Sequence, residues 1–207
     1  KMTLFEALTA ARQKIDRLDA RLLLEYATGC THADLLARPE TPVIAPAYAQ
    51  FAEWVERRAA GEPLAYLVGE AEFRGRTFQV SPDVLIPRPE TEVLIELALD
   101  RLYGIEAPGI LDLGTGSGIV AISLALERPA ATLVAVDLEK GAISVARNNA
   151  GRLGARIDFR QGDWFAPVAG ERFDLIVSNP PYVAEGDPHL ERDGLPFEPR
   201  MALTDGA

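Results

Sequence analysis

The sequence predicts an α/β protein: a Rossmann-like domain with a parallel sheet, preceded by a small helical domain and a β-hairpin linker. Three observations predict this organisation. Residues 1–61 show helical periodicity. Glycines and prolines break residues 62–87 into short apolar runs, as in hairpins. From residue 88 onward, apolar runs alternate with helical segments, which is typical of parallel strands joined by right-handed crossovers.

The N-terminal region, residues 1–61, is predicted to form small helices. One helix is expected between Asp16, which is suited to cap its start, and Gly29, which is suited to end it. A second helix is expected over about 46–60. The region carries no recognisable chemistry, and the aromatic side chains of its two expected helices, Tyr26, Phe51 and Trp54, are interpreted as core. We expect it to pack on the next domain or to dock a partner.

The linker and the second domain continue this pattern. In the linker, 62–87, the two strands of the hairpin are expected at 66–68 and 77–80. In the second domain, 88–207, the first helix is expected to begin near Pro89, because proline suits a first helical turn. The predicted strands then cover 109–113, 132–136, 157–159 and 173–178, with helices over 119–126 and about 139–152.

Composition and charge exclude several classes of function. The 207 residues carry a net charge of −10, which argues against binding a nucleic-acid backbone by counterion release. The single cysteine, Cys30, excludes an internal disulfide and a cysteine-based metal cluster, and no metal site is expected. No apolar run is long enough to span a bilayer and no signal pattern is visible, so we expect a cytoplasmic monomer without membrane contact.

The loop after the first predicted strand, residues 114–118 (the glycine loop), indicates a cofactor site. A dinucleotide-binding pattern would place a third glycine at position 119, which is Ile119 here. Asp112 is expected at the mouth of the site, where a carboxylate repels a pyrophosphate but attracts an ammonium or a sulfonium. S-adenosylmethionine carries both cations and no phosphate. The sequence therefore favours S-adenosylmethionine as the cofactor.

Polar and aromatic residues also follow the next two strands. Asp137 lies 19 residues past Gly118, where an acidic residue holds the ribose hydroxyls of an adenosine cofactor. Asp163 is suited to accept from the adenine amino group, and Trp164 to cover the adenine ring. The alternative is that Asp163 caps a turn and Trp164 fills the core. Their place in this series of strand ends favours the cofactor role.

The fourth strand ends at Asn179-Pro180-Pro181-Tyr182 (the tetrad), because two prolines have no N–H groups for a central strand ladder. The Asn179 side-chain oxygen and the Pro180 carbonyl can each accept one hydrogen of a planar NH2 group. The Tyr182 ring can lie against the flat face of that group. Together with the cofactor, the tetrad predicts a methyltransferase that acts on a planar nitrogen.

The predicted site residues fall into three groups. The cofactor-binding group is Asp112, Gly114, Thr115, Gly116, Ser117, Gly118, Asp137, Asp163, Trp164 and Asn179. The catalytic group is the tetrad: Asn179, Pro180, Pro181 and Tyr182. The substrate-binding group is the tetrad with Arg88, which either binds substrate or caps the next helix. Glu198 is either functional or a surface charge.

These residues, with several further motifs, resemble the peptide chain release factor N5-glutamine methyltransferases of the HemK/PrmC type over nearly the whole chain. The motifs are residues 61–63 with Tyr66 and Gly69, the run 86–92, the glycine loop, 163–165, 178–182 and 197–199. The resemblance implies a helical domain that docks the substrate, a hairpin linker and a methyltransferase domain. It also implies the substrate, which is the glutamine of the Gly-Gly-Gln motif in release factors.

One departure from that family concerns the sheet, which in the family has three more strands after the tetrad. Only four parallel strands are predicted here, so the methyltransferase domain is expected to lack the last strands. The strand before the tetrad is then expected at an edge of the sheet.

Three alternative functions remain. The tetrad suits an adenine amino group equally well, so a nucleic-acid adenine N6-methyltransferase is the main alternative. The acidic charge and the lack of a basic, aromatic-rich segment count against it. A non-catalytic binding module is the second alternative. A nucleotide-dependent oxidoreductase is disfavoured by Asp112 and Ile119.

Overall fold

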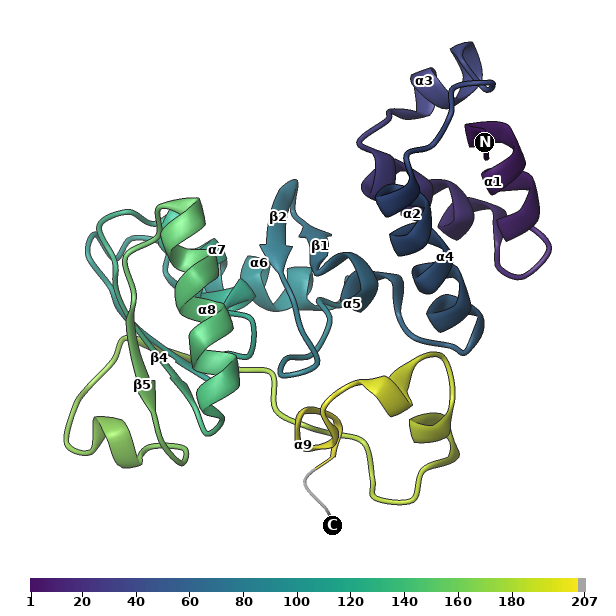
Figure 1. The fold of residues 1–207 in the computed structure, drawn as a ribbon. Helices are drawn as coiled ribbons and strands as arrows, with labels where there is room; N and C mark the ends of the chain where they lie inside the picture. The colour runs from purple at the N-terminus through teal and green to yellow at the C-terminus, as the bar shows by residue number, and fades with distance from the viewer. Residues whose placement is uncertain (205–207) are drawn as a thin grey trace. The chain divides into compact units, whose positions relative to one another are not determined.

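The computed structural model describes residues 1–204 and comprises two compact units, Lys1–Val68 and Gly69–Ala207 (Figure 1). The first unit is helical, and both sheets belong to the second. Each unit has a hydrophobic core of its own. Within the described residues, no helix is long and apolar enough to cross a membrane.

The first unit consists of α1 (Leu4–Ala11), α2 (Arg17–Thr28), α3 (His32–Ala37), α4 (Ala45–Ala59) and α5 (Leu64–Val68). The expected limits of α2 are confirmed: the Asp16 carboxylate accepts from the Leu18 N–H at 2.7 Å, and Gly29 ends the helix at φ 72°. The buried face of α2 carries Ala20, Leu23 and Leu24. Tyr26 lies off that face and is 49% exposed, so its interpretation as core is wrong.

The segment 66–68 is a helix, not the expected strand. The Pro63 carbonyl accepts from the N–H groups of both Tyr66 and Leu67, which starts the helical turn of α5. Gly69, at φ 76°, then ends the helix in a conformation that other residues rarely adopt. A local proline-initiated turn therefore outweighs the β propensity of this short apolar run.

A hairpin follows immediately and belongs to the second unit. Its strands are β1 (Glu70–Phe73) and β2 (Arg76–Gln79), paired antiparallel. Both turn residues have positive φ, 49° at Arg74 and 69° at Gly75, as in the tight turns that match strand twist. The predicted hairpin is present, with its first strand shifted toward the C-terminus.

The main sheet of the second unit is parallel, as predicted, and its strand order is β5-β4-β3-β6. The strands are β3 (Gly109–Leu113), β4 (Thr132–Asp137), β5 (Asp158–Gln161) and β6 (Leu175–Ser178). Among the described residues, β6 forms one edge. The helices α6 (Thr91–Arg101), α7 (Ile119–Glu127) and α8 (Lys140–Leu153) alternate with the strands. The carboxyl ends of all four strands therefore meet at one edge of the sheet.

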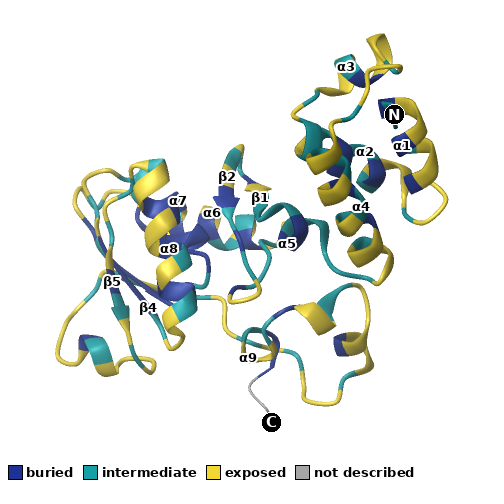
Figure 2. Cartoon of the chain, in the orientation of Figure 1, coloured by how far each residue is buried: buried dark blue, intermediate teal, exposed yellow. Residues whose placement is uncertain are grey.

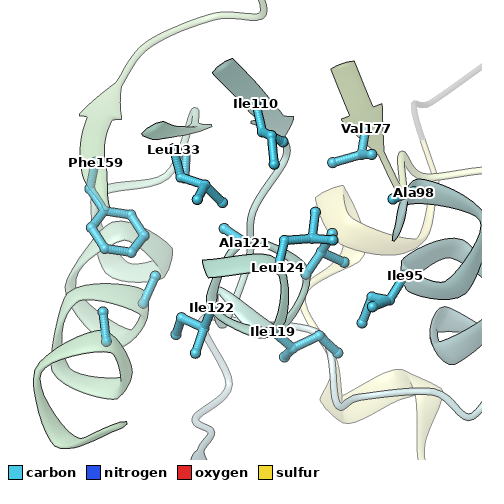
Figure 3. Close-up of a cluster of buried hydrophobic side chains, with 14 of the residues drawn as sticks. Ile95, Ala98, Ile110, Ile119, Ala121, Ile122, Leu124, Leu133, Phe159 and Val177 are labelled. Carbon is cyan, nitrogen blue, oxygen red and sulfur yellow. The ribbon is translucent and has the colours of Figure 1, made fainter. Parts of the chain in front are cut away.

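The two faces of this sheet bury alternate side chains of each strand. Figure 3 shows Ile110, Leu133 and Val177 pointing from the strands toward α7. Every residue of α7 from Ile119 to Leu124 is buried, and the helix is dark blue over this part in Figure 2. A fully buried Leu or Ile contributes about 1.5–3 kcal/mol relative to exposure, so this layer holds the strand ends in place.

The opposite face of the sheet has a smaller cluster of buried residues, with Val168 of the short helix η1 (Ala166–Val168) packed against it. The chain after β6 forms the short helices η2 (Pro188–Glu191), η3 (Leu195–Phe197) and α9 (Arg200–Leu203). The Val183 N–H donates to the Leu203 carbonyl at 3.0 Å, which ties the end of this segment back to its beginning.

Candidate active site

A cavity of about 290 Å³ opens at the carboxyl ends of the parallel strands. It lies where the strand order reverses, the usual ligand position in open α/β sheets. The predicted site residues that line it are Arg88, Asp112, Gly114, Thr115, Gly116, Ser117, Asp137, Asp163, Trp164, Asn179, Pro180 and Pro181. Gly118 and Tyr182 are not among the described lining residues.

The charges of the lining indicate the class of ligand. Five carboxylates line the cavity, those of Asp83, Asp112, Asp137, Glu139 and Asp163, against a single guanidinium among the described lining residues, that of Arg88. A phosphate-bearing ligand would meet net repulsion in such a site, whereas a cationic ligand is attracted. Three or more His, Cys, Asp or Glu side chains in a metal-binding arrangement do not occur in the described part of the chain.

Asp112 lies buried beneath the glycine loop, not at the mouth of the site as expected. It is still part of strand β3, so its side chain points toward α7 as that of Ile110 does. Its carboxylate accepts from the Thr115 hydroxyl at 2.7 Å and from the Ala121 N–H in the first turn of α7. Burial raises the pKa of Asp112 from its usual 3.8 to about 6, and the nearby Asp137 carboxylate adds to this shift in pKa.

The glycine loop is held by backbone hydrogen bonds to the next strand. The Gly114 and Thr115 N–H groups donate to the Val136 carbonyl at 2.9 and 3.0 Å. A Cβ added at Gly114 or Gly116 would meet nothing within 4 Å, so both backbones face open space. Gly118 differs, because a Cβ added there would lie 3.1 Å from the Cβ of Ala146 in α8. Gly114 and Gly116 therefore leave room for a ligand, whereas Gly118 lets α8 approach.

Replacing Gly118 by alanine is expected to destabilise the protein by about 2–4 kcal/mol, because φ 84° strains a side-chain-bearing residue and the new methyl overpacks against Ala146. Gly151→Ala is the matched control, since its Cβ would meet nothing within 4 Å inside helix α8. That substitution is expected to stabilise by about 0.5–1 kcal/mol. Urea denaturation measures both, and a Gly118→Ala protein as stable as wild type would contradict the packing argument.

Asp137 stands at the end of β4 with its carboxylate held by two backbone groups. One oxygen accepts from the Gly116 N–H at 2.8 Å and the other from the Glu139 N–H at 3.0 Å. A carboxylate oxygen can accept more than one hydrogen bond, so both remain able to bind hydroxyls. Asp137 thus links the glycine loop to the second strand end and faces the same cavity.

The third strand end brings Asp163 and Trp164 to the rim of the cavity. Trp164 is 54% exposed, so the alternative that it fills the core is wrong. Its φ of 43° is strained for a residue with a side chain, and such strain is common at ligand sites. Gly162 allows this turn, because a Cβ there would lie 2.3 Å from the Pro167 ring.

The tetrad begins where β6 ends, as predicted. The Ser178 hydroxyl donates to the Leu113 carbonyl at 2.9 Å, which joins the end of β6 to the end of β3. Asn179, Pro180 and Pro181 then line the cavity. Tyr182 is 81% exposed and lies outside the lining, so the structure brings three of the four residues together.

Arg88 and Glu198, whose roles the sequence left open, form one ion pair. The Glu198 side chain is 1% exposed and also accepts from the Ile86 N–H at 3.0 Å. Glu198 is therefore not a surface charge. The pair joins the run 86–92 to the segment 197–199, which are separated by more than 100 residues in sequence, and no local signal predicts that contact.

Double-mutant analysis tests this pair. The effects of Arg88→Ala and Glu198→Ala on the free energy of unfolding are expected to be non-additive by about 1–2 kcal/mol. Either change alone leaves a charged partner without its hydrogen bonds. The exposed pair Arg200–Glu185 is the control, with an expected coupling below about 1 kcal/mol. Equal coupling energies for the two pairs, from urea denaturation, would argue against a buried role for Glu198.

Asn149 of α8 is a further residue near the site that sequence reasoning missed. It is fully buried, and its side-chain amide donates to the Ser117 carbonyl of the glycine loop at 2.9 Å. An asparagine in the middle of an amphipathic helix is ordinarily a surface residue, so the pattern alone carries no signal for it.

Comparison with known proteins agrees with this geometry. The PrmC N-terminal domain family model matches residues 3–69, and the methyltransferase small domain family model matches residues 90–191. The release factor glutamine methyltransferase of Burkholderia pseudomallei is 50% identical over 92% of this chain and 70% of its own length.

Two further relatives carry the same name. The protein from Bordetella pertussis is 51% identical over 99% of this chain and 76% of its own length. The protein from Xylella fastidiosa (strain 9a5c) is 47% identical over 96% of this chain and 73% of its own length. With half of its residues shared over nearly its whole length, and with an acidic cavity between a glycine loop and an Asn-Pro-Pro strand end, the chain belongs to the family of S-adenosylmethionine-dependent release factor glutamine methyltransferases.

Proposed function

We propose that this chain transfers a methyl group from S-adenosylmethionine to the side-chain amide nitrogen of the Gly-Gly-Gln glutamine in peptide chain release factors. The observation that carries the proposal is the cavity lining. Carboxylates surround the glycine loop, and two hydrogen-bond acceptors, the Asn179 side-chain oxygen and the Pro180 carbonyl, belong to the lining residues beside it. A cationic methyl donor and a planar nitrogen thus each have a suitable part of one cavity.

The chain fits this cofactor at three groups of residues. Gly114 and Gly116 leave open space for a ligand. Asp112 offers a buried carboxylate under the loop, and Asp137 offers hydrogen-bond acceptors for ribose hydroxyls. Asp163 and Trp164 are assigned to the adenine. When bound, the cofactor supplies a methyl group on a positively charged sulfur.

The residues of the tetrad orient the acceptor nitrogen. An amide nitrogen is a poor nucleophile because its lone pair is delocalised. Accepting both of its hydrogens at Asn179 and Pro180 directs the nitrogen toward the methyl group and favours the more positive nitrogen of the transition state. The methyl group would come from the cofactor held at the glycine loop, and the amide nitrogen that Asn179 and Pro180 orient would lose one proton to water. No strong general base is required.

We further propose how the rest of the chain takes part. All described residues that line the cavity belong to the second unit, and we assign docking of the release factor to the helical unit. Arg88 is assigned to the substrate side of the cavity. We infer a cytoplasmic monomer that binds a protein substrate and makes no direct contact with nucleic acid, in keeping with the net charge of −10.

The proposal is tested by incubating the chain with a release factor and S-adenosylmethionine, followed by mass analysis of the peptides. One added methyl group is expected on the Gly-Gly-Gln glutamine, and a release factor with alanine at that position should stay unmodified. DNA and RNA are tested in parallel. Methylated adenine with an untouched release factor would overturn the proposal, and failure to bind the cofactor by calorimetry would favour a non-catalytic module.

A further inference from the structure

Asn149 uses its whole side-chain amide to join three segments of the second unit. Its nitrogen donates to the Ser117 carbonyl and to the Gln79 carbonyl, each at 2.9 Å. Its oxygen accepts from the Gln79 N–H at 2.7 Å. The opposite orientation of the amide would place its oxygen against two carbonyls. One fully buried side chain therefore ties α8 to the glycine loop and to the end of strand β2.

Helix α8 makes two further close contacts with the same two segments. One turn before Asn149, Ala146 lies where a Cβ on Gly118 would meet it at 3.1 Å. Near the start of the helix, a Cβ on Gly141 would lie 2.8 Å from the Asp83 carboxyl carbon. The helix thus meets the glycine loop at Ser117 and Gly118, the end of β2 at Gln79, and the chain after β2 at Asp83.

Both of these segments line the cavity. The glycine loop forms one part of the lining, and the run from Asp83 to Arg88, which begins four residues after Gln79, forms another. Because Ser117 lies between two glycines of positive φ, few side-chain constraints hold its peptide group. The N–H of this peptide group, on Gly118, donates to the Thr115 carbonyl within the loop at 2.8 Å. Its carbonyl, on Ser117, accepts from Asn149, which fixes the peptide group against α8.

We propose that Asn149 is a positioning residue of the cofactor site, which holds the glycine loop and the chain after β2 at the spacing that S-adenosylmethionine requires. It acts through Ser117 and Gln79. The inference rests on the proposed function only in taking the glycine loop as the cofactor-binding loop.

Asn149→Asp tests the proposal, because a carboxyl group has the shape of the amide but lacks the two hydrogens that the amide donates. The carbonyls of Ser117 and Gln79 then face oxygen atoms, and the loop must shift. We expect the dissociation constant for S-adenosylmethionine, measured by calorimetry, to rise by about tenfold or more, since a buried carbonyl loses its donor. The value of kcat at saturating cofactor should change less than the dissociation constant does.

Two controls separate positioning from general loss of stability. Asn148→Asp adds the same charge to an exposed neighbour on the same helix. Leu102→Ala removes a fully buried core side chain that does not line the cavity. Both should bind the cofactor within about twofold of wild type, as expected for sites that do not interact. Equal losses of affinity in Asn149→Asp and Leu102→Ala would overturn the proposal, as would unchanged affinity in Asn149→Asp.

A measurement on the wild-type chain covers the case in which Asn149→Asp does not fold. Saturation with S-adenosylmethionine should slow amide hydrogen exchange at Gln79 as well as in the glycine loop, because Asn149 connects them. Exchange at Gln79 that is unaffected by the cofactor would overturn the proposal. A wild-type chain that fails to bind the cofactor would instead overturn the proposed function, so the two failures are distinguishable.

Discussion

Replacing Asn179 by alanine is expected to lower the rate of methyl transfer to a release factor by about 10²–10³-fold, as for other groups that stabilise developing charge. The substitution removes the side-chain oxygen that accepts one amide hydrogen, while the Pro180 carbonyl remains. The acceptor nitrogen then loses its direction toward the methyl group. Single-turnover experiments with labelled cofactor measure the rate.

Binding of S-adenosylmethionine by the Asn179→Ala protein should stay largely intact, because the glycine loop and the buried Asp112 are untouched. Calorimetry measures this binding separately from the rate. Asn148→Ala, at an exposed position on α8, is the matched control and should transfer methyl groups as wild type does. A full rate in Asn179→Ala, or a loss of cofactor binding that accounts for the lost rate, would exclude the role assigned to the Asn179 side chain.

Replacing Asp112 by asparagine is expected to stabilise the protein without cofactor and to weaken cofactor binding. The pKa of Asp112 is raised by burial from 3.8 to about 6. The protonated form of Asp112 therefore contributes to the free energy of unfolding. This contribution is fully present below the unfolded pKa of 3.8 and is lost as the pH rises through about 6. At pH 7.5 the ionised carboxylate therefore lowers the free energy of unfolding by up to about 3 kcal/mol. The neutral amide of the Asp112→Asn protein would not lower it in this way.

Urea denaturation from about pH 3 to about pH 8 measures this difference, because the range brackets the unfolded pKa of 3.8 and the folded pKa of about 6. The free energy of unfolding of the wild type should fall as the pH rises across this range, and that of Asp112→Asn should fall less. Asp100→Asn, an exposed position on α6, changes the net charge equally and is expected to follow the wild type. Parallel curves for Asp112→Asn and wild type would show that Asp112 does not titrate in this range.

Cofactor binding should respond in the opposite direction. The Asp112 carboxylate is buried, so it attracts a cation more strongly than a carboxylate in water does. Its loss is expected to raise the dissociation constant for the cofactor on the order of tenfold or more. In the wild type, binding should weaken as the pH falls through about 6, because Asp112 then becomes protonated. Calorimetry on either side of this pKa measures both effects, and a pH dependence that persists in Asp112→Asn would assign it to another group.

The order of strands, loops and helices in the second unit could be predicted from the sequence because the signals are local. The run 109–113 is mostly apolar and is followed by the glycine loop, and β3 has the same limits. The two prolines of the tetrad mark the end of β6 at Ser178, because they cannot join a strand ladder. The strand prediction for the short run 66–68 was wrong, because a turn that begins at Pro63 makes this run helical.

The contacts that complete the site depend instead on tertiary structure. Arg88 meets Glu198 and Asn149 meets Gln79 across 110 and 70 residues of sequence. Asp112 is buried in a strand over which α7 packs, and Tyr182 is exposed to solvent outside the cavity lining. Local patterns predict which residues end the strands and what chemistry they offer. Burial and long-range hydrogen bonds, which arise only when the elements pack, decide which of those groups share one cavity and how strongly their pKa values are shifted.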